Sequence, residues 1–181
     1  CSYCYAKSLL DFRNLWNPTN PRVANIDKIK KQINKIKPGS VVRLGGMTDC
    51  FQAIEKEYGI TYETIKLLNE RRIHYLIVTK SDLVADDRYL EILDKELAHI
   101  QISITSTDDN IALQYENAPS TSRRIAAIEK LYKLDYEIYK VNQKMEMNKE
   151  HLSYEVFNDT LTKAIKDKEF SENAIKIIEE V

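Results

Sequence analysis

Three short runs of β-branched and aliphatic residues, separated by segments with helical periodicity, place the strongest limit on the fold of this chain. The runs cover residues 40–44, 75–79 and 99–105, and their composition is typical of buried strands. Strands that alternate with helices at intervals of roughly 25 to 35 residues form successive βαβ units, whose crossover connections make the strands parallel. The sequence therefore predicts an α/β fold built on a parallel sheet.

Helical periodicity marks the segments between these strands. Isoleucines recur at helical spacing over residues 26–36, directly behind Asn25, a residue type that caps helix N-termini. Further helices are predicted behind Thr61, over residues 89–97, and from Pro119 onward. Each of these helices follows a strand or precedes one, as crossover helices do.

The pattern changes towards the C-terminal end of the sequence. Residues 136–141 have the composition of a further strand, residues 142–148 are polar, and two apolar stripes at helical spacing follow over residues 152–165 and 174–178. We therefore predict a sheet domain over residues 1–141 and a helical C-terminal segment over residues 142–181.

Polar residues follow each of the three strand runs directly. They are Gly-Gly-Met-Thr-Asp at residues 45–49, Thr-Lys-Ser-Asp at residues 79–82 and Thr-Ser-Thr-Asp-Asp at residues 105–109. Because the C-terminal ends of parallel strands meet at one edge of a sheet, these groups are expected to lie close together. The sequence therefore predicts one shared binding site at that edge.

Charge and cysteine content limit the class of protein. The formal net charge of −1 does not favour wrapping nucleic acid or lying on an anionic membrane. No apolar run approaches the roughly 18 residues of a membrane span, and no signal-peptide pattern is present. Three cysteines cannot form a disulfide framework. We expect a cytoplasmic protein that makes no membrane contact.

Two of the three cysteines, Cys1 and Cys4, form a Cys-Ser-Tyr-Cys sequence, whereas Cys50 stands alone and is interpreted as a small buried residue. A C-x-x-C pair by itself is compatible with part of an iron–sulfur site, half of a zinc site or a thiol-redox pair. Redox pairs stand at a helix start behind a strand, and zinc ribbons need a second cysteine pair. The sequence lacks both features, so zinc is the poorer fit.

Four motifs together resemble those of radical S-adenosylmethionine (radical SAM) proteins related to spore photoproduct lyase. In chain order they are CSYCYA at residues 1–6, GGMTDCFQAIE at 45–55, TKSDLV at 79–84 and YENAPSTSRRIAAI at 115–128. Four motifs in the same order are far more specific than any one of them. The resemblance implies a partial (β/α)6 TIM-type barrel, incomplete in this chain, followed by C-terminal helices.

This resemblance implies the activity and the cofactors. Such enzymes hold a [4Fe-4S] cluster with three cysteines, and an electron from a donor such as flavodoxin or ferredoxin cleaves bound SAM to a 5′-deoxyadenosyl radical that acts on a substrate. Cys1 and Cys4 match the last two cluster ligands, and the first would lie four positions before Cys1. The catalytic residues and the substrate are unknown, and the net charge gives nucleic acid no support as a partner.

The same resemblance implies which residues contact SAM. Lys80 would hold its carboxylate, and Arg124 would anchor a helix start rather than bind substrate. Met47 stands where most relatives carry glutamate, which leaves that polar contact to the two residues behind it. The complete set of expected SAM-binding residues is Gly45, Gly46, Thr48, Asp49, Lys80, Ser81, Ser103 and Thr105.

Parts of the family pattern have no counterpart in this sequence. They are the first barrel strand, the first cluster cysteine and a later strand that lines the SAM pocket. We therefore expect a fragment with an exposed sheet edge at residues 40–44, inactive as it stands because two cysteines hold a cluster poorly. The alternative is a non-catalytic α/β interaction domain whose C-x-x-C pair is structural or binds zinc.

Overall fold

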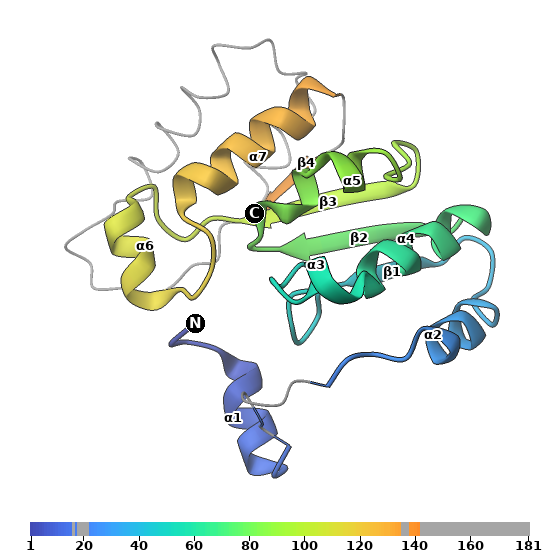
Figure 1. Ribbon diagram of the computed structural model, residues 1–181, viewed down its shortest axis with the longest axis horizontal. Helices are drawn as coiled ribbons and strands as arrows, with labels where there is room; N and C mark the ends of the chain where they lie inside the picture. The colour runs from blue at the N-terminus through green and yellow to red at the C-terminus, as the bar shows by residue number, and fades with distance from the viewer. Residues whose placement is uncertain (16, 18–21, 135–137, 142–181) are drawn as a thin grey trace.

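The computed structural model describes residues 1–15, 17, 22–134 and 138–141, and a parallel sheet lies at its centre (Figure 1). The strands of this described part are β1 (Val41–Leu44), β2 (His74–Thr79), β3 (Ala98–Ser103) and β4 (Ile138–Val141). They lie in the order β1-β2-β3-β4, and each neighbouring pair is parallel. The predicted α/β fold with a parallel sheet is confirmed.

Helices precede and connect these strands. Asn25 caps the helix that it was predicted to cap, because its side chain accepts a hydrogen bond of 3.0 Å from the backbone N–H of Lys28. None of the described helices is long and apolar enough to cross a bilayer. They are α1 (Tyr5–Phe12), α2 (Ile26–Ile33), α3 (Glu55–Tyr58), α4 (Ile60–Glu70), the 3-10 helix η1 (Asp82–Ala85), α5 (Asp87–Leu90), α6 (Asp109–Tyr115) and α7 (Thr121–Lys133).

The predicted strands agree with the observed ones to within two residues at each end, but one predicted helix is wrong. Residues 89–97 are helical only as far as Leu90, where α5 ends. The Asp94 side chain accepts a hydrogen bond of 2.9 Å from the N–H of Glu96, an arrangement that favours a turn over a continued helix. Leu93 and Leu97 are nevertheless buried, so these turns still contribute apolar side chains to the core.

The further strand predicted at residues 136–141 is observed as β4, in which Ile138 pairs with Ile100 of β3. The expected C-terminal helical segment, residues 142–181, lies outside the described residues. At the other side of the described sheet, β1 is an edge strand whose Val41 is 61% exposed. This is the exposed edge expected from the sequence.

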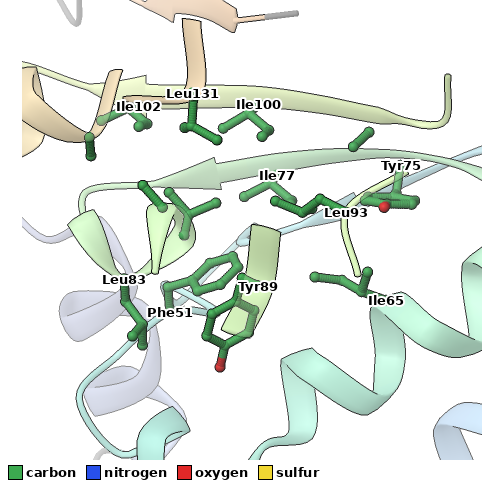
Figure 2. Close-up of a cluster of buried hydrophobic side chains, with 14 of the residues drawn as sticks. Phe51, Ile65, Tyr75, Ile77, Leu83, Tyr89, Leu93, Ile100, Ile102 and Leu131 are labelled. Carbon is green, nitrogen blue, oxygen red and sulfur yellow. The ribbon is translucent and has the colours of Figure 1, made fainter. Parts of the chain in front are cut away.

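The apolar core lies between the sheet and the helices that cover one of its faces (Figure 2). Tyr75 and Ile77 of β2 are completely buried, and alternate residues of the strand are only half-buried, as the two-residue period of a strand requires. The rings of Phe51 and Tyr89 meet edge to face, with centroids 4.9 Å apart. Helix α4 contributes Ile65 to the same cluster.

A buried carboxylate holds the start of α4. Both oxygens of Glu55 accept hydrogen bonds of 2.9 Å from first-turn N–H groups, those of Thr61 and Tyr62. The hydroxyl of Tyr89 donates a third bond of 2.8 Å. These donors compensate the loss of water around the charge, and the helix N-terminus favours an anion. Burial raises the pKa of Tyr89, and the hydrogen bond to Glu55 raises it further.

Replacement of Tyr89 by phenylalanine should lower the free energy of unfolding by about 1 kcal/mol at neutral pH, because one hydrogen bond to a buried acceptor is lost. The pKa of Tyr89 is raised in the folded state above its ordinary value of 10.0. Its contribution is therefore complete below that value and is lost as the pH rises through the folded-state pKa. Denaturant unfolding followed by circular dichroism should show a steeper loss of stability above about pH 10 in the wild type than in Tyr89→Phe. Equal slopes would contradict this account.

Candidate functional site

Residues 1–4 form a tight turn, here named the cysteine turn, that leads into α1. The N–H of Cys4 donates a hydrogen bond of 3.3 Å to the carbonyl of Cys1. Both thiols are free; Cys1 is exposed and Cys4 is half-buried. The turn therefore presents two thiols on one short loop, and the start of the chain lies beside α6 (Figure 1).

The two residues between the cysteines attach the turn to the end of α6. The N–H of Ser2 donates to the carbonyl of Tyr115 at 2.8 Å, and its hydroxyl is 3.3 Å from the same oxygen. The hydroxyl of Tyr3 donates to Oε1 of Glu116. Burial raises the pKa of Tyr3, and the contact with Glu116 adds to the shift. The cysteine turn is thus held by two consecutive residues that follow β3.

Glu116 is in turn held by a buried ion pair. Its Oε2 accepts a hydrogen bond of 2.6 Å from Nη2 of Arg124, and both side chains are 1% exposed. Nη1 of Arg124 also donates to the carbonyl of Ser103 at 2.8 Å, where β3 ends. Arg124 anchors the start of α7, as expected from the sequence.

Lys80, directly behind β2, completes this group of charges. Its Nζ lies 4.0 Å from Oε1 of Glu116 and 5.7 Å from the ring centroid of Tyr3. Burial lowers the pKa of Lys80, Glu116 opposes that shift, and Arg124 reinforces it. Cys4 lies close enough to oppose the shift as well. A lysine predicted to bind SAM thus lies next to Tyr3, the residue that precedes a cysteine predicted to bind the cluster.

Asp49 connects the loop behind β1 to the end of β2. Its Oδ1 accepts hydrogen bonds from the hydroxyl of Thr79 at 2.7 Å and from the N–H of Phe51 at 2.9 Å. Its Oδ2 accepts one of 2.7 Å from the N–H of Lys80. These contacts fix the backbone that carries Lys80. Asp49 therefore has a structural role at the predicted site: it fixes the end of β2.

The two glycines behind β1 have different surroundings. Gly45 has a φ of +89°, and a Cβ atom there would lie 2.1 Å from the carbonyl oxygen of Val78 in β2. A side chain is therefore excluded by the neighbouring strand. A Cβ atom at Gly46 would meet no atom within 4 Å. Of the pair, only Gly46 leaves open space at this rim.

The remaining predicted residues differ in exposure and contacts. Thr48 is exposed, and its hydroxyl accepts a hydrogen bond from Gln52. Ser81 is buried and caps η1, because its hydroxyl accepts a bond of 3.2 Å from the N–H of Leu83. The side chain of Thr105 lies close enough to the Tyr3 hydroxyl to lower the pKa of Tyr3, against the larger effects of burial and Glu116 that raise it. Ser103 is buried, and its carbonyl binds the Arg124 guanidinium.

The structure therefore brings Cys4, Lys80 and Thr105 together around two residues that the sequence did not select, Tyr3 and Glu116. Both belong to motifs quoted above. The position of Tyr3 between two candidate cluster ligands could have marked it as a residue of the site. The contact joins positions 113 residues apart, however, and has no signature in the sequence. Within the described ranges, no group of three or more metal-binding side chains occurs.

Cys50 differs chemically from the other two cysteines. It is half-buried, and burial raises the pKa of its thiol strongly, with Asp49 adding to the shift. A thiol in such surroundings stays protonated and is a poor metal ligand or nucleophile. This agrees with its interpretation as a packing residue.

Substitution of the two glycines should separate their roles. Gly45→Ala should lower the free energy of unfolding by more than about 2 kcal/mol, because it introduces a clash with Val78 at a positive φ. Gly46→Ala should change it by less than about 1 kcal/mol, since its Cβ meets open space. Urea denaturation of the two variants measures the difference. Equal destabilisation would show that the loop is not held against β2 as described.

Comparison with known proteins places this geometry in a family. Residues 1–145 match the model of the radical SAM superfamily. A spore photoproduct lyase mutant aligns with a TM-score of 0.72 and 19% identity, over 93% of this chain and 49% of that chain. A mutant with dinucleoside spore photoproduct aligns with a TM-score of 0.71 and 19% identity, over 99% of this chain and 56% of that chain.

A further spore photoproduct lyase mutant, with bound AdoMet, aligns with a TM-score of 0.67 and 19% identity, over 99% of this chain and 56% of that chain. This chain thus spans about half the length of these structures. No curated protein matches it significantly. The family match covers most of the sequence, and the parallel sheet with its helices has the fold of these structures. The chain belongs to the radical SAM superfamily, and its fold is that of the spore photoproduct lyase structures.

Proposed function

We propose that this chain is part of a radical SAM enzyme, in which Cys1 and Cys4 bind a [4Fe-4S] cluster and the polar strand ends bind SAM. The observation that carries the proposal is the position of the cysteine turn. It is fixed by Ser2 and Tyr3 against the rim of the sheet, beside Lys80. The candidate cluster ligands and the candidate SAM-binding residues therefore lie in one place.

The chemistry of the donors fits the cluster. Cys1 and Cys4 are both free thiols on one short turn, Cys1 exposed and Cys4 half-buried, and cysteine thiolates are the ligands of [4Fe-4S] clusters. Cluster binding by three thiolates also needs a ligand beyond these two, which the family pattern places four positions before Cys1. Cys50 is not a suitable third ligand, because burial raises the pKa of its thiol and keeps it protonated.

Several residues of the rim suit the parts of SAM. The ammonium of Lys80 can pair with the SAM carboxylate. The absence of a side chain at Gly46, where a Cβ atom would meet no atom within 4 Å, leaves space for the SAM amine. The hydroxyl of Thr105 lies on the same rim and suits a ribose hydroxyl or the carboxylate. The rim itself is held in place by hydrogen bonds of Ser81, Ser103 and Asp49 within the chain. Their own contacts with SAM stay a prediction.

Bound cluster and SAM supply the reductive cleavage of a carbon–sulfur bond in SAM, from which the radical chemistry of this family starts. The residues of the cysteine turn and of the strand ends would bind and orient these groups. The proposal includes a cytoplasmic electron donor of the flavodoxin or ferredoxin type, because the cluster must be reduced before each cleavage. The substrate stays open.

The role of the cysteine turn is tested in the complete natural protein that contains this sequence. Cys1→Ala and Cys4→Ala should each lower the amount of iron and sulfide bound after anaerobic reconstitution. They should also lower the cluster absorbance at about 400 nm. Cys50→Ala is the matched control and should retain both, because its protonated thiol is not expected to be a ligand.

Iron binding that is unaffected by Cys1→Ala and Cys4→Ala would refute the proposal. Stoichiometric zinc bound through the same two cysteines, without iron, would instead support the interaction domain with a zinc-binding C-x-x-C pair. Elemental analysis of protein purified without added metal separates these results.

Replacement of Lys80 should weaken SAM binding. In Lys80→Ala the dissociation constant for SAM should rise by at least about tenfold, because a charge-assisted contact with the carboxylate is lost. Lys130→Ala is a suitable control: its ammonium pairs with exposed Asp87 at 2.7 Å, on a different part of the surface. Titration calorimetry of the reconstituted protein measures both, and an unchanged constant in Lys80→Ala would remove this residue from the SAM site.

A further inference from the structure

We infer that Glu116 is a positioning residue that sets the place of the cysteine turn at the rim of the sheet, acting through the hydroxyl of Tyr3. The inference deepens the proposed function and rests on it, because it assumes that the cysteine turn holds the cluster. It adds a part of the chain far from the cysteines in sequence, the loop between α6 and α7, to the residues that determine how a cluster is held.

One carboxylate joins three separate segments of the chain. Oε2 of Glu116 pairs with Arg124 of α7 at 2.6 Å. Oε1 accepts the hydrogen bond of Tyr3 from the cysteine turn and lies 4.0 Å from Nζ of Lys80 behind β2. Any displacement of this carboxylate would therefore move the cysteine turn relative to Lys80.

The carboxylate is fixed independently of the cysteine turn. Arg124 donates to Ser103 at the end of β3 at 2.8 Å, and its Nη2 lies 3.4 Å from the hydroxyl of Thr121. That hydroxyl donates to the carbonyl of Ser106 at 2.8 Å. These groups belong to the sheet rim and to α7. The rim is therefore the rigid partner, and the cysteine turn is the part that docks on it.

Burial of Glu116 favours a single position of the cysteine turn. The side chain of Glu116 is 1% exposed, so water does not reach it freely. A carboxylate oxygen left there without a hydrogen-bond donor would destabilise the folded state. The Tyr3 hydroxyl can donate a hydrogen bond to Oε1 only when the cysteine turn lies against the loop that follows α6. The adjacent bond from Ser2 to Tyr115 adds a second, neighbouring attachment, which also limits rotation of the turn. Both thiols are next to these two anchored residues.

The contact of Tyr3 has a counterpart elsewhere in the chain. Tyr89 likewise donates its hydroxyl to a buried glutamate, Glu55, at the start of α4. The hydrogen bonds of the Glu55 carboxylate come from Thr61 and Tyr62 of α4 and from Tyr89 of α5, which are not part of the cysteine turn. Tyr89→Phe therefore removes the same kind of bond as Tyr3→Phe, without touching the proposed cluster site.

The experiment compares Tyr3→Phe with Tyr89→Phe in the complete, reconstituted protein. Tyr3→Phe should release iron to a chelator about fivefold faster than the wild type, the factor that corresponds to about 1 kcal/mol for one hydrogen bond. It should also change the electron paramagnetic resonance spectrum of the reduced cluster. Tyr89→Phe should leave the release rate and the spectrum unchanged, although it lowers the unfolding free energy to a similar extent.

Two results would overturn the inference: iron release and a spectrum in Tyr3→Phe equal to those of the wild type, or equal changes in the two tyrosine variants. A parallel measurement on Cys4→Ala separates this failure from that of the proposed function. Loss of the cluster in Cys4→Ala, with wild-type behaviour of Tyr3→Phe, refutes only the positioning role of Glu116. Retention of iron in Cys4→Ala refutes the proposed function itself.

Discussion

The buried ion pair between Glu116 and Arg124 is the interaction on which the arrangement of the site depends. Two charges with 1% exposed side chains are stable only while each compensates the other, so the loop before α7 and the end of β3 are held in one relative position. The other oxygen of the carboxylate, Oε1, then accepts a hydrogen bond from the hydroxyl of Tyr3. A pair that looks purely structural thereby determines where the cysteine turn lies.

The residues at the rim of the parallel sheet form two groups with different roles. Asp49 and Gly45 hold neighbouring strand ends together, through backbone donors in one case and through the absence of a side chain in the other. Lys80, Gly46 and Thr105 lie on the same rim and are the candidates for contact with SAM. This division follows from the fold, because a rim that binds a charged ligand must first be fixed by contacts that the ligand does not provide.

Two buried glutamates illustrate how the chain compensates negative charge. Glu55 accepts two N–H groups at a helix start, whereas Glu116 pairs with a guanidinium. Each also accepts a tyrosine hydroxyl. The first stabilises the helical layer behind the sheet, and the second lies at the rim beside the cysteines. The same chemistry thus serves the fold at one place and the proposed cluster site at the other.

The sequence by itself determined the parallel sheet, the strand positions, the cap at Asn25 and the family, because periodicity, capping and motif order are properties of neighbouring residues. It did not reveal the turns that replace the helix at residues 91–97, where a side-chain bond of Asp94 competes with helical hydrogen bonds. Tertiary structure alone decided that Gly45 is excluded from carrying a side chain and that Tyr3 meets Glu116. Both depend on which strand ends and loops the sheet brings side by side, and no local pattern encodes that distance.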